Sequence, residues 1–394
     1  MLKKPILSRR LMITLALIYD IFRFGFFAVF TGLHAVLMMG LVLEWRRDRK
    51  CLRSKAAQSS DPQVSVIIPV HNETLRMEGL LRSLALQDYA KAEFIFVDDR
   101  STDESARMIG DFIRERPAMR LISITENTAL NRKQYALGKG IEVSSGEFIL
   151  FTDADCEIPQ GWISAMVKRM SGPKTGIALG PVFKKPGGRG FFHLYQCFEH
   201  SVRYMYLAAS TGIGAAGGGF GNNMILRRAS LDAIGGYSSV PPSPTEDAAL
   251  VSKIRSSAGY KIRAAISADV HVITGPENNW KDFITQTLRW NNGGLFSPDC
   301  ATRFNYGFLV ITISMGILAL PLLLFIPSLW PLSAAVMISM SANTIATLLL
   351  FGGSLPRKGA AYLFQLVFTP MYFTFLTILG LCGIRSKWKG NELK

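Results

Sequence analysis

The sequence predicts an α/β domain with a mostly parallel sheet, joined to apolar segments long enough to cross a membrane. Between residues 64 and 152, short apolar runs rich in β-branched residues alternate with helical patterns. This alternation is typical of βαβ units. Acidic side chains follow several of the runs, where the strands of such a sheet would end. Four long apolar stretches lie outside this region, and about 20 apolar residues are needed to span a bilayer.

The domain is expected to begin with the run VSVIIPV at 64–70, a pattern typical of a strand buried on both faces. Three further strands are expected at 93–97, 120–125 and 148–152. Helices are expected between them at 75–86, 104–115 and 131–143. The sequence Ser-Thr-Asp-Glu at 101–104 matches a capping box and would open the second helix. Strands joined through helices in this way run parallel, with right-handed crossovers.

The pattern is less regular after residue 159. Helices are expected at 162–170, 191–209, 248–254 and 280–290, and strand-like runs at 223–227 and 264–274. The aromatic-rich helix at 191–209 would either pack in the core or lie on the bilayer surface. The glycine-rich stretch at 212–221 lacks the Gly-Lys-Ser/Thr of a phosphate-binding loop. We interpret it as a flexible segment or as a close approach of the backbone to a ligand.

The apolar stretches lie at 11–43, 306–329, 331–351 and 361–384. The first is too long for a signal-peptide core, and we expect a retained anchor that spans the membrane at 24–43, because Asp20 and Arg23 interrupt the earlier part. The expected organisation is an anchor at 1–50, a linker at 51–63, the α/β domain at 64–300, and about three membrane helices within 301–394. One span before the domain and three after it would place two basic tails outside, which the positive-inside rule disfavours. Either one stretch is re-entrant or interfacial, or the short basic tails cross the membrane.

The net charge of +15 does not indicate nucleic-acid binding, because the basic residues gather beside the apolar stretches. The densest group follows the first stretch and comprises Arg46, Arg47, Arg49, Lys50, Arg53 and Lys55. This distribution is typical of membrane proteins that contact anionic lipids. The five cysteines form no C-x-x-C pair, so a reduced compartment is expected, without disulfides or a zinc site.

Asp153 and Asp155 directly follow the expected strand at 148–152. Side chains at positions i and i+2 of a strand share one side, so the two carboxylates would repel each other without a cation between them. A hard divalent cation that bridges to phosphate is the usual solution. Ligands also bind at the carboxyl ends of parallel strands. The sequence therefore predicts a metal site there.

Other acidic residues lie at element ends, namely Asp98, Asp99, Glu157, Glu246 and Asp247. Helix capping would explain those that precede helices, but it explains Asp153 and Asp155 poorly. A catalytic interpretation uses the whole set, with one group on a nucleoside, one pair on a metal-bound diphosphate and one carboxylate as a base. Lys133 and Arg289 would then neutralise phosphate charge.

Five motifs occur in a fixed order: VSVIIPVHNE at 64–73, VDDRSTDES at 97–105, TDAD at 152–155, TED at 245–247 and QTLRW at 286–290. With these motifs the chain resembles membrane-bound family 2 glycosyltransferases of the GT-A fold, whose last motif is Q-x-x-R-W. The resemblance covers about 64–290. It implies that Asp247, beside Glu246, is the base. It implies donor binding by Pro69, Glu73, Asp98, Asp99, Lys133, Asp153, Gln286, Arg289 and Trp290. It implies that Asp153, Asp155 and Glu157 hold Mg²⁺ or Mn²⁺.

The resemblance also implies a reaction, an inverting transfer of sugar from a nucleotide-sugar, most commonly a UDP-sugar. The short membrane region, without an F-x-V-T-x-K gating loop, favours a membrane lipid or lipid-linked acceptor over a processive polysaccharide synthase. A non-catalytic membrane subunit that only binds sugar nucleotide is a third interpretation, which the complete acidic set disfavours. The expected location is the membrane, as a multi-pass protein with a cytosolic catalytic domain, in the inner membrane if bacterial. His71 and His271 are interpreted as structural rather than as site residues.

Overall fold

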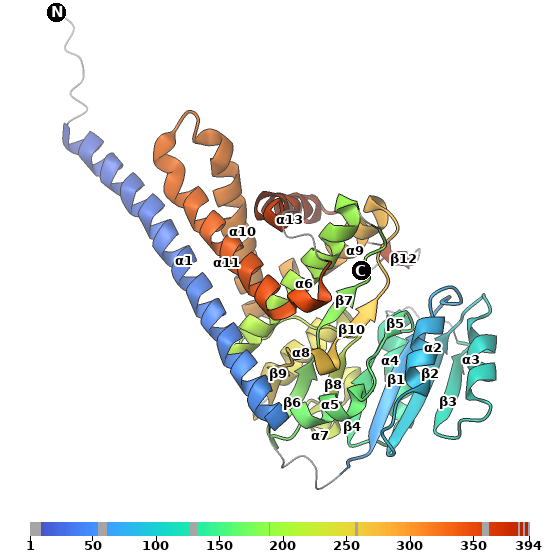
Figure 1. Ribbon diagram of the computed structural model, residues 1–394. Coiled ribbons are helices and arrows are strands. Elements are labelled where there is room, and N and C mark those ends of the chain that lie inside the picture. The colour runs from blue at the N-terminus through green and yellow to red at the C-terminus, as the bar shows by residue number, and fades with distance from the viewer. Residues whose placement is uncertain are drawn as a thin grey trace, which may run out of the picture.

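A computed structural model describes residues 9–53, 61–126, 132–188, 190–256, 259–356, 362–384, 387–388 and 391–392 (Figure 1). Its centre is a seven-stranded sheet in the order β3-β2-β1-β4-β8-β6-β9. These strands are β1 (Val64–Val70), β2 (Ala92–Asp99), β3 (Met119–Ile124), β4 (Phe148–Phe151), β6 (Thr175–Leu179), β8 (Met224–Arg227) and β9 (Lys261–Ala264). The first four run parallel, as expected, whereas β8 runs antiparallel to both β4 and β6.

A three-stranded sheet in the order β5-β10-β7 lies beside the first. It consists of β5 (Cys156–Glu157), β10 (Val272–Thr274) and β7 (Val182–Lys184). The range 264–274 was expected to contain a strand-like run, and β10 lies at its end. Residues at its two ends belong to different sheets, because a short 3₁₀ turn at Ala268–Val270 separates them.

Helices cover both faces of the larger sheet. One face packs against α4 (Arg132–Val143) and α8 (Glu246–Ser256). The other packs against α2 (Glu78–Ala85), α3 (Ser105–Ile113) and α5 (Trp162–Arg169). Alternate residues of β1 feed the two cores, with Ile67 on one face and Val66 and Ile68 on the other, as expected of a strand buried on both sides. The short helix α7 (Arg228–Asp232) follows β8.

The capping box expected at 101–104 is wrong. The Asp103 side chain accepts the backbone N–H of Ser105 at 3.0 Å and that of Thr74 at 3.1 Å. Ser101 instead accepts the backbone N–H of Asn72 at 3.0 Å. The side chains of this turn therefore tie the loop after β1 to the start of α3, where sequence spacing alone suggested a local cap.

The aromatic helix α6 (Phe191–Gly212) is a core element, the first of the two interpretations considered for it. Most of its residues from Leu194 onward are buried, and it packs against β7, β9 and two apolar helices, α1 (Arg9–Arg53) and α11 (Trp330–Phe351). In Figure 1 it lies between the sheet and the apolar helices. The crossing with α1 is close, because a side chain at Gly212 would collide with the carbonyl oxygen of Gly40.

Buried polar contacts fix the end of α1 to the domain. Asp48 pairs with Arg169 of α5 at 2.9 Å and also accepts the backbone N–H of Ile266 at 3.0 Å. Arg169 pairs with Asp269 at 2.7 Å as well. Glu44 accepts the backbone N–H of Ala264 at 3.0 Å. The C-terminal part of α1 is thus packed against the domain.

Replacing Arg169 with leucine should destabilise the protein by about 3–5 kcal/mol, because Asp48 would be left buried without its cation. Arg169 is only 5% exposed. Thermal unfolding of the solubilised protein measures the loss. Arg114→Leu is the control, since Arg114 pairs with Asp111 on the surface, and such pairs contribute about 0–1 kcal/mol. Equal melting temperatures for the two variants would contradict this account of the anchor.

Among the residues that the structure describes, three helical segments are long and apolar enough to cross a membrane: Leu11–Arg53, Cys300–Leu322 and Pro327–Ser354. They correspond to α1, α10 (Cys300–Leu322) and α11. The fourth expected stretch forms α13 (Gln365–Leu381), which has 17 residues and is shorter than a typical span. In Figure 1, α13 runs in a different direction from α10 and α11 and lies near α9 (Trp280–Leu295). After it come the two-residue strands β11 (Lys387–Trp388) and β12 (Asn391–Glu392).

Candidate active site

A cavity of about 530 Å³ opens beside the carboxyl end of β4. Eight of the residues expected at the site line it: Lys133, Asp153, Asp155, Glu246, Asp247, Gln286, Arg289 and Trp290. They come from four separate segments, namely α4, the turn after β4, the first turn of α8, and α9. The fold therefore gathers most of the acidic and basic motif residues around one space.

Lys133 links two of the acidic motifs. Its ammonium group lies 2.7 Å from Asp153 Oδ1 and 3.5 Å from Glu246 Oε1. Burial alone would lower the pKa of Lys133, but the charges of Asp153, Glu246 and Asp247 together hold it above its usual value. Burial also raises the pKa of Glu246, which Lys133 opposes and Asp247 reinforces. Lys133 is therefore a fixed positive charge at the centre of the acidic cluster.

Asp155 lies in a second charged group. Arg76 bridges Glu73, at 3.0 Å, and Asp155, at 3.6 Å. Burial raises the pKa of Asp155, and the negative charges of Asp153 and Glu73 add to the effect. A divalent cation between Asp153 and Asp155 would relieve this repulsion.

The Asp153 and Asp155 carboxylates also fit a cation that takes its remaining ligands from a substrate. Within the ranges that the structure describes, no three His, Cys, Asp or Glu side chains are grouped closely enough to hold a metal ion. Mg²⁺ is commonly bound by one or two carboxylates together with substrate phosphates and water. Asp153 and Asp155 are a pair of this kind.

Asp247 is held by the glycine-rich segment. Its Oδ2 accepts the backbone N–H of Gly221 at 2.8 Å, and its Oδ1 accepts that of Ala248 at 2.8 Å. A side chain at Gly219 would lie 2.8 Å from the Asp247 Cβ, so the loop can approach this closely only because it lacks one. The backbone of the segment thus lies close to the Asp247 side chain, whereas the approach to a ligand that was expected stays a prediction.

The QTLRW motif lies on α9. Gln286 accepts a hydrogen bond from Lys184 at 2.8 Å and donates one to Glu277 at 2.7 Å. Arg289 donates to the carbonyl of Pro244 at 3.0 Å, which fixes the loop before Glu246. The Trp290 ring lies 5.4 Å from the His200 ring. The motif thus connects α9 to both the acidic cluster and the helix α6.

Five expected residues do not line the cavity: Pro69, Glu73, Asp98, Asp99 and Glu157. Pro69, Asp98 and Asp99 lie on the adjacent strands β1 and β2, and Glu73 reaches the site only through Arg76. Asp99 is 2% exposed, and its Oδ2 has no hydrogen-bond partner among the described residues. Glu157 on β5 pairs with Lys185. It therefore does not share the metal-ligand position expected for Asp153 and Asp155.

The two histidines considered at the sequence level are bound to other parts of the fold. His71 Nδ1 lies 2.7 Å from the Asp99 carbonyl oxygen. His271 contacts the Ile266 carbonyl and the Ser354 hydroxyl, each at 3.0 Å. Neither lines the cavity, in agreement with their structural interpretation.

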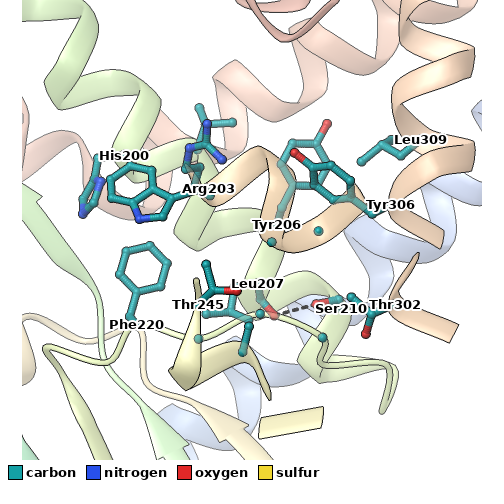
Figure 2. A pocket seen from close by; sticks show the side chains of 18 of the residues that line it. His200, Arg203, Tyr206, Leu207, Ser210, Phe220, Thr245, Thr302, Tyr306 and Leu309 are labelled. Carbon is teal, nitrogen blue, oxygen red and sulfur yellow. Dashed lines mark hydrogen bonds between the residues drawn. The ribbon is translucent and has the colours of Figure 1, made fainter. Parts of the chain in front are cut away.

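The polar residues of the cavity lining that sequence reasoning missed include Lys184, His200, Arg203 and Glu277. His200 and Arg203 lie on α6, whose aromatic residues indicated a core or bilayer-surface helix and gave no indication of a binding site. Sequence reasoning also missed that the cavity continues to the apolar helices, where Phe30, Leu33 and Leu37 of α1 and Leu309 of α10 line it. Figure 2 shows Tyr306 and Leu309 beside Tyr206 at this end, with His200 and Arg203 further along.

Comparison with known proteins agrees with this geometry. A model of the family described as Glycosyl transferase family 21 matches residues 27–394. The chain belongs to this glycosyltransferase family. The motifs alone suggested family 2, and that finer assignment stays a prediction. The matched range includes most of α1 together with the helices after the domain.

Two curated relatives are named as a glucolipid synthase and a probable glycosyltransferase. A Beta-monoglucosyldiacylglycerol synthase of Nostoc sp. is 25% identical over 208 residues, which cover 52% of this chain and 43% of that protein. The Probable glycosyltransferase YdaM of Bacillus subtilis is 25% identical over 299 residues, covering 72% of this chain and 66% of that protein. The chain thus spans less than half the length of the first of these relatives and about two thirds of the second.

A solved structure shares the fold. The mannosyltransferase PcManGT of Pyrobaculum calidifontis, solved in complex with GDP-Man and Mn²⁺, matches with a TM-score of 0.54 and 20% sequence identity. The match covers 90% of this chain and 99% of that one. At this identity the likeness concerns the fold alone.

Proposed function

We propose that this family 21 member transfers a sugar from a nucleotide-sugar to a hydroxyl of a membrane lipid or lipid-linked acceptor. The single observation that carries the proposal is the continuous cavity. One end is lined by the charged groups Asp153, Asp155 and Asp247, and the other by Leu33 and Leu309 of helices apolar enough to cross a membrane. A polar donor and an apolar acceptor can meet only in a space of this mixed kind.

The donor would bind at the charged end, in a GT-A arrangement. Its nucleoside would lie toward Asp99, whose buried, unpartnered oxygen suits a ribose hydroxyl or a base N–H. Lys133 and Arg289 would face the diphosphate and stabilise its negative charge as it leaves. A Mg²⁺ or Mn²⁺ ion held by Asp153 and Asp155 would supply further charge stabilisation when bound. Glu157 remains a more distant candidate ligand, since Lys185 already pairs with it.

Asp247 would act as the base. Its two oxygens accept backbone N–H groups, and these bonds orient the carboxylate toward the cavity that it lines. It would take the proton of the acceptor hydroxyl as that oxygen attacks the anomeric carbon, with inversion. Glu246, which pairs with Lys133, would position that cation. The proposed donor is a UDP-sugar, with GDP-sugars as the class to test beside it.

We propose that α1, α10 and α11 cross the membrane and that the catalytic domain is cytosolic. The basic group at residues 46–53 then lies on the cytosolic side, as the positive-inside rule requires. With α13 at the interface instead of across the bilayer, the basic segment after it lies on the same side. This arrangement places the C-terminal basic tail on the cytosolic side, whereas the basic residues before α1 still lie on the opposite side.

Binding of the acceptor at the apolar end of the cavity can be tested by filling that end with a larger side chain. Leu309→Trp should lower transfer to lipid about tenfold or more, because displacement of a bound acceptor by even 1 Å is costly. Transfer is measured as radiolabel from the donor that enters the organic phase. Hydrolysis of the donor by water should be unchanged.

Leu318→Trp is the matched control, since Leu318 lies on the same helix, is 58% exposed and does not line the cavity. If both tryptophan variants transfer sugar to lipid as fast as the wild type, the acceptor does not use this space.

A further inference from the structure

Lys184 is a buried lysine that contacts the Q-x-x-R-W motif. It is the last residue of β7, is 3% exposed, and donates a hydrogen bond from its ammonium group to Gln286 Oε1 at 2.8 Å. The Glu277 carboxylate lies 3.5 Å from the same ammonium group, and the Phe283 ring lies 5.7 Å from it. A buried ammonium group is costly unless partners compensate it, and packing alone would be served as well by an apolar side chain.

Glu277 completes a network around the Gln286 amide. Its Oε1 accepts a hydrogen bond from Gln286 Nε2 at 2.7 Å. Its backbone is held by the fully buried Gln196 of α6, which accepts the Glu277 N–H at 2.8 Å and donates to the Glu277 carbonyl at 3.0 Å. Four segments therefore contribute to this network, namely β7, α6, the loop after β10 and α9.

The two charged partners fix which way the Gln286 amide points. The last torsion of a glutamine side chain is broad and nearly two-fold, so a carboxamide can exchange its oxygen and nitrogen by half a turn. An ammonium group only donates hydrogen bonds and a carboxylate only accepts them, so Lys184 selects the oxygen and Glu277 selects the nitrogen. One N–H and one oxygen lone pair of the amide remain for a ligand in the cavity that Gln286 lines.

The network lies at the charged end of the cavity. Lys184, Glu277 and Gln286 line the cavity, as does Asp155. Burial lowers the pKa of Lys184, and the negative charges that oppose this lowering and favour the ammonium form include those of Glu277 and Asp155. Asp155 is the carboxylate that the proposed function places on the metal-bound diphosphate. The Gln286 amide therefore borders the proposed diphosphate position.

We propose that Lys184 and Glu277 are positioning residues, which lock the Gln286 amide so that its remaining N–H donates to an oxygen of the donor diphosphate. This inference rests on the proposed function and adds two residues to its donor site. Neither charged side chain is assigned a contact with the substrate or a step in the chemistry. Because Lys184 acts through Gln286, a variant without Lys184 loses the contribution of Gln286 and no other donor contact.

The test is a double-mutant cycle between Lys184→Met and Gln286→Ala in the full-length protein. Methionine removes the hydrogen-bond donor and keeps an unbranched side chain. The donor KM and kcat are measured with the nucleotide-sugar that supports transfer, and the affinity for UDP and for GDP with Mg²⁺ is measured by titration calorimetry. Lys174→Met is the control, because Lys174 is exposed and does not line the cavity.

Lys184→Met should raise the donor KM and weaken nucleotide binding about tenfold, the effect of about one hydrogen bond to a charged group. Its kcat should stay within about threefold of wild type, because the lost contact holds the bound donor and the transition state alike. Gln286→Ala should have a similar effect. The double variant should be no worse than either single variant, since residues that act through one contact are not additive. Lys174→Met should behave like wild type.

Effects that multiply to about 100-fold in the double variant overturn the proposal, because Lys184 then acts independently of Gln286. An unchanged donor KM in Lys184→Met also overturns it. If thermal unfolding shows that Lys184→Met does not fold, Lys184→Met combined with Glu277→Gln replaces it, since this variant leaves neither charge without its partner. Wild-type nucleotide affinity in that folded variant overturns the proposal as well.

Failure of the proposed function gives a different result. In that case the wild type binds nucleotide but transfers sugar from no donor, and the calorimetric cycle still decides whether Lys184 acts through Gln286. Wild-type transfer together with unchanged nucleotide affinity in Lys184→Met refutes the role of Lys184 alone.

Discussion

Asp247→Asn should reduce sugar transfer about 10²- to 10⁴-fold, the range that general acid–base groups contribute, and should leave nucleotide binding nearly unchanged. The amide cannot accept the proton of the attacking hydroxyl. It can still accept the backbone N–H of Ala248 through Oδ1, whereas the bond from Gly221 to Oδ2 would be lost, because the amide nitrogen in that place is a donor. Transfer to lipid is measured with radiolabelled donor, and nucleotide affinity by titration calorimetry.

Asp111→Asn is the control for this variant, because Asp111 is a surface carboxylate of α3 that pairs with Arg114. It should transfer sugar at the wild-type rate. Full activity in Asp247→Asn would remove Asp247 from the role of base. A parallel loss of nucleotide binding would instead point to collapse of the glycine-rich loop that contacts it.

Asp155→Ala should reduce transfer about 10²- to 10³-fold, the cost of removing one group that stabilises developing charge. It should also make donor binding insensitive to EDTA. The reason is that, in the proposed function, Asp155 is one of two carboxylates that would share a cation with the diphosphate. Donor affinity is measured with Mg²⁺, with Mn²⁺ and with EDTA, for the wild type and the variant.

Asp232→Ala, at the end of α7, provides the comparison, since Asp232 is exposed and does not line the cavity. It should retain the EDTA response of the wild type. Wild-type donor binding that is equal with and without EDTA would show that Asp153 and Asp155 do not act through a metal ion.

The sequence predicts the first half of the domain, because its elements are built from local patterns. Strands β1 to β4 and the helices between them follow directly from apolar runs separated by helical periodicity. The second half depends on pairing between distant segments. The strands β5 and β7 have two and three residues, too few for a periodic signal, and the antiparallel placement of β8 follows from tertiary contacts alone.

The candidate site likewise contains residues that the sequence predicts and residues that it does not. Asp153, Asp155 and Asp247 are visible in the sequence because they occur at the ends of recognisable elements. His200 and Arg203 are not, because they lie on a helix whose aromatic pattern is that of a core element. Which residues of α6 face the cavity is decided by the packing of α1 and α11 against it, and no local pattern encodes that arrangement.

The measurement that tests the central claim most directly is transfer in membranes that contain the expressed protein. A panel of radiolabelled UDP- and GDP-sugars is supplied with Mg²⁺ or Mn²⁺, and the products are extracted into organic solvent. We expect label from one donor to enter the organic phase as glycolipid. Label that stays in insoluble or high-mass material would indicate a polysaccharide synthase, and nucleotide binding without transfer from any donor would contradict the catalytic assignment.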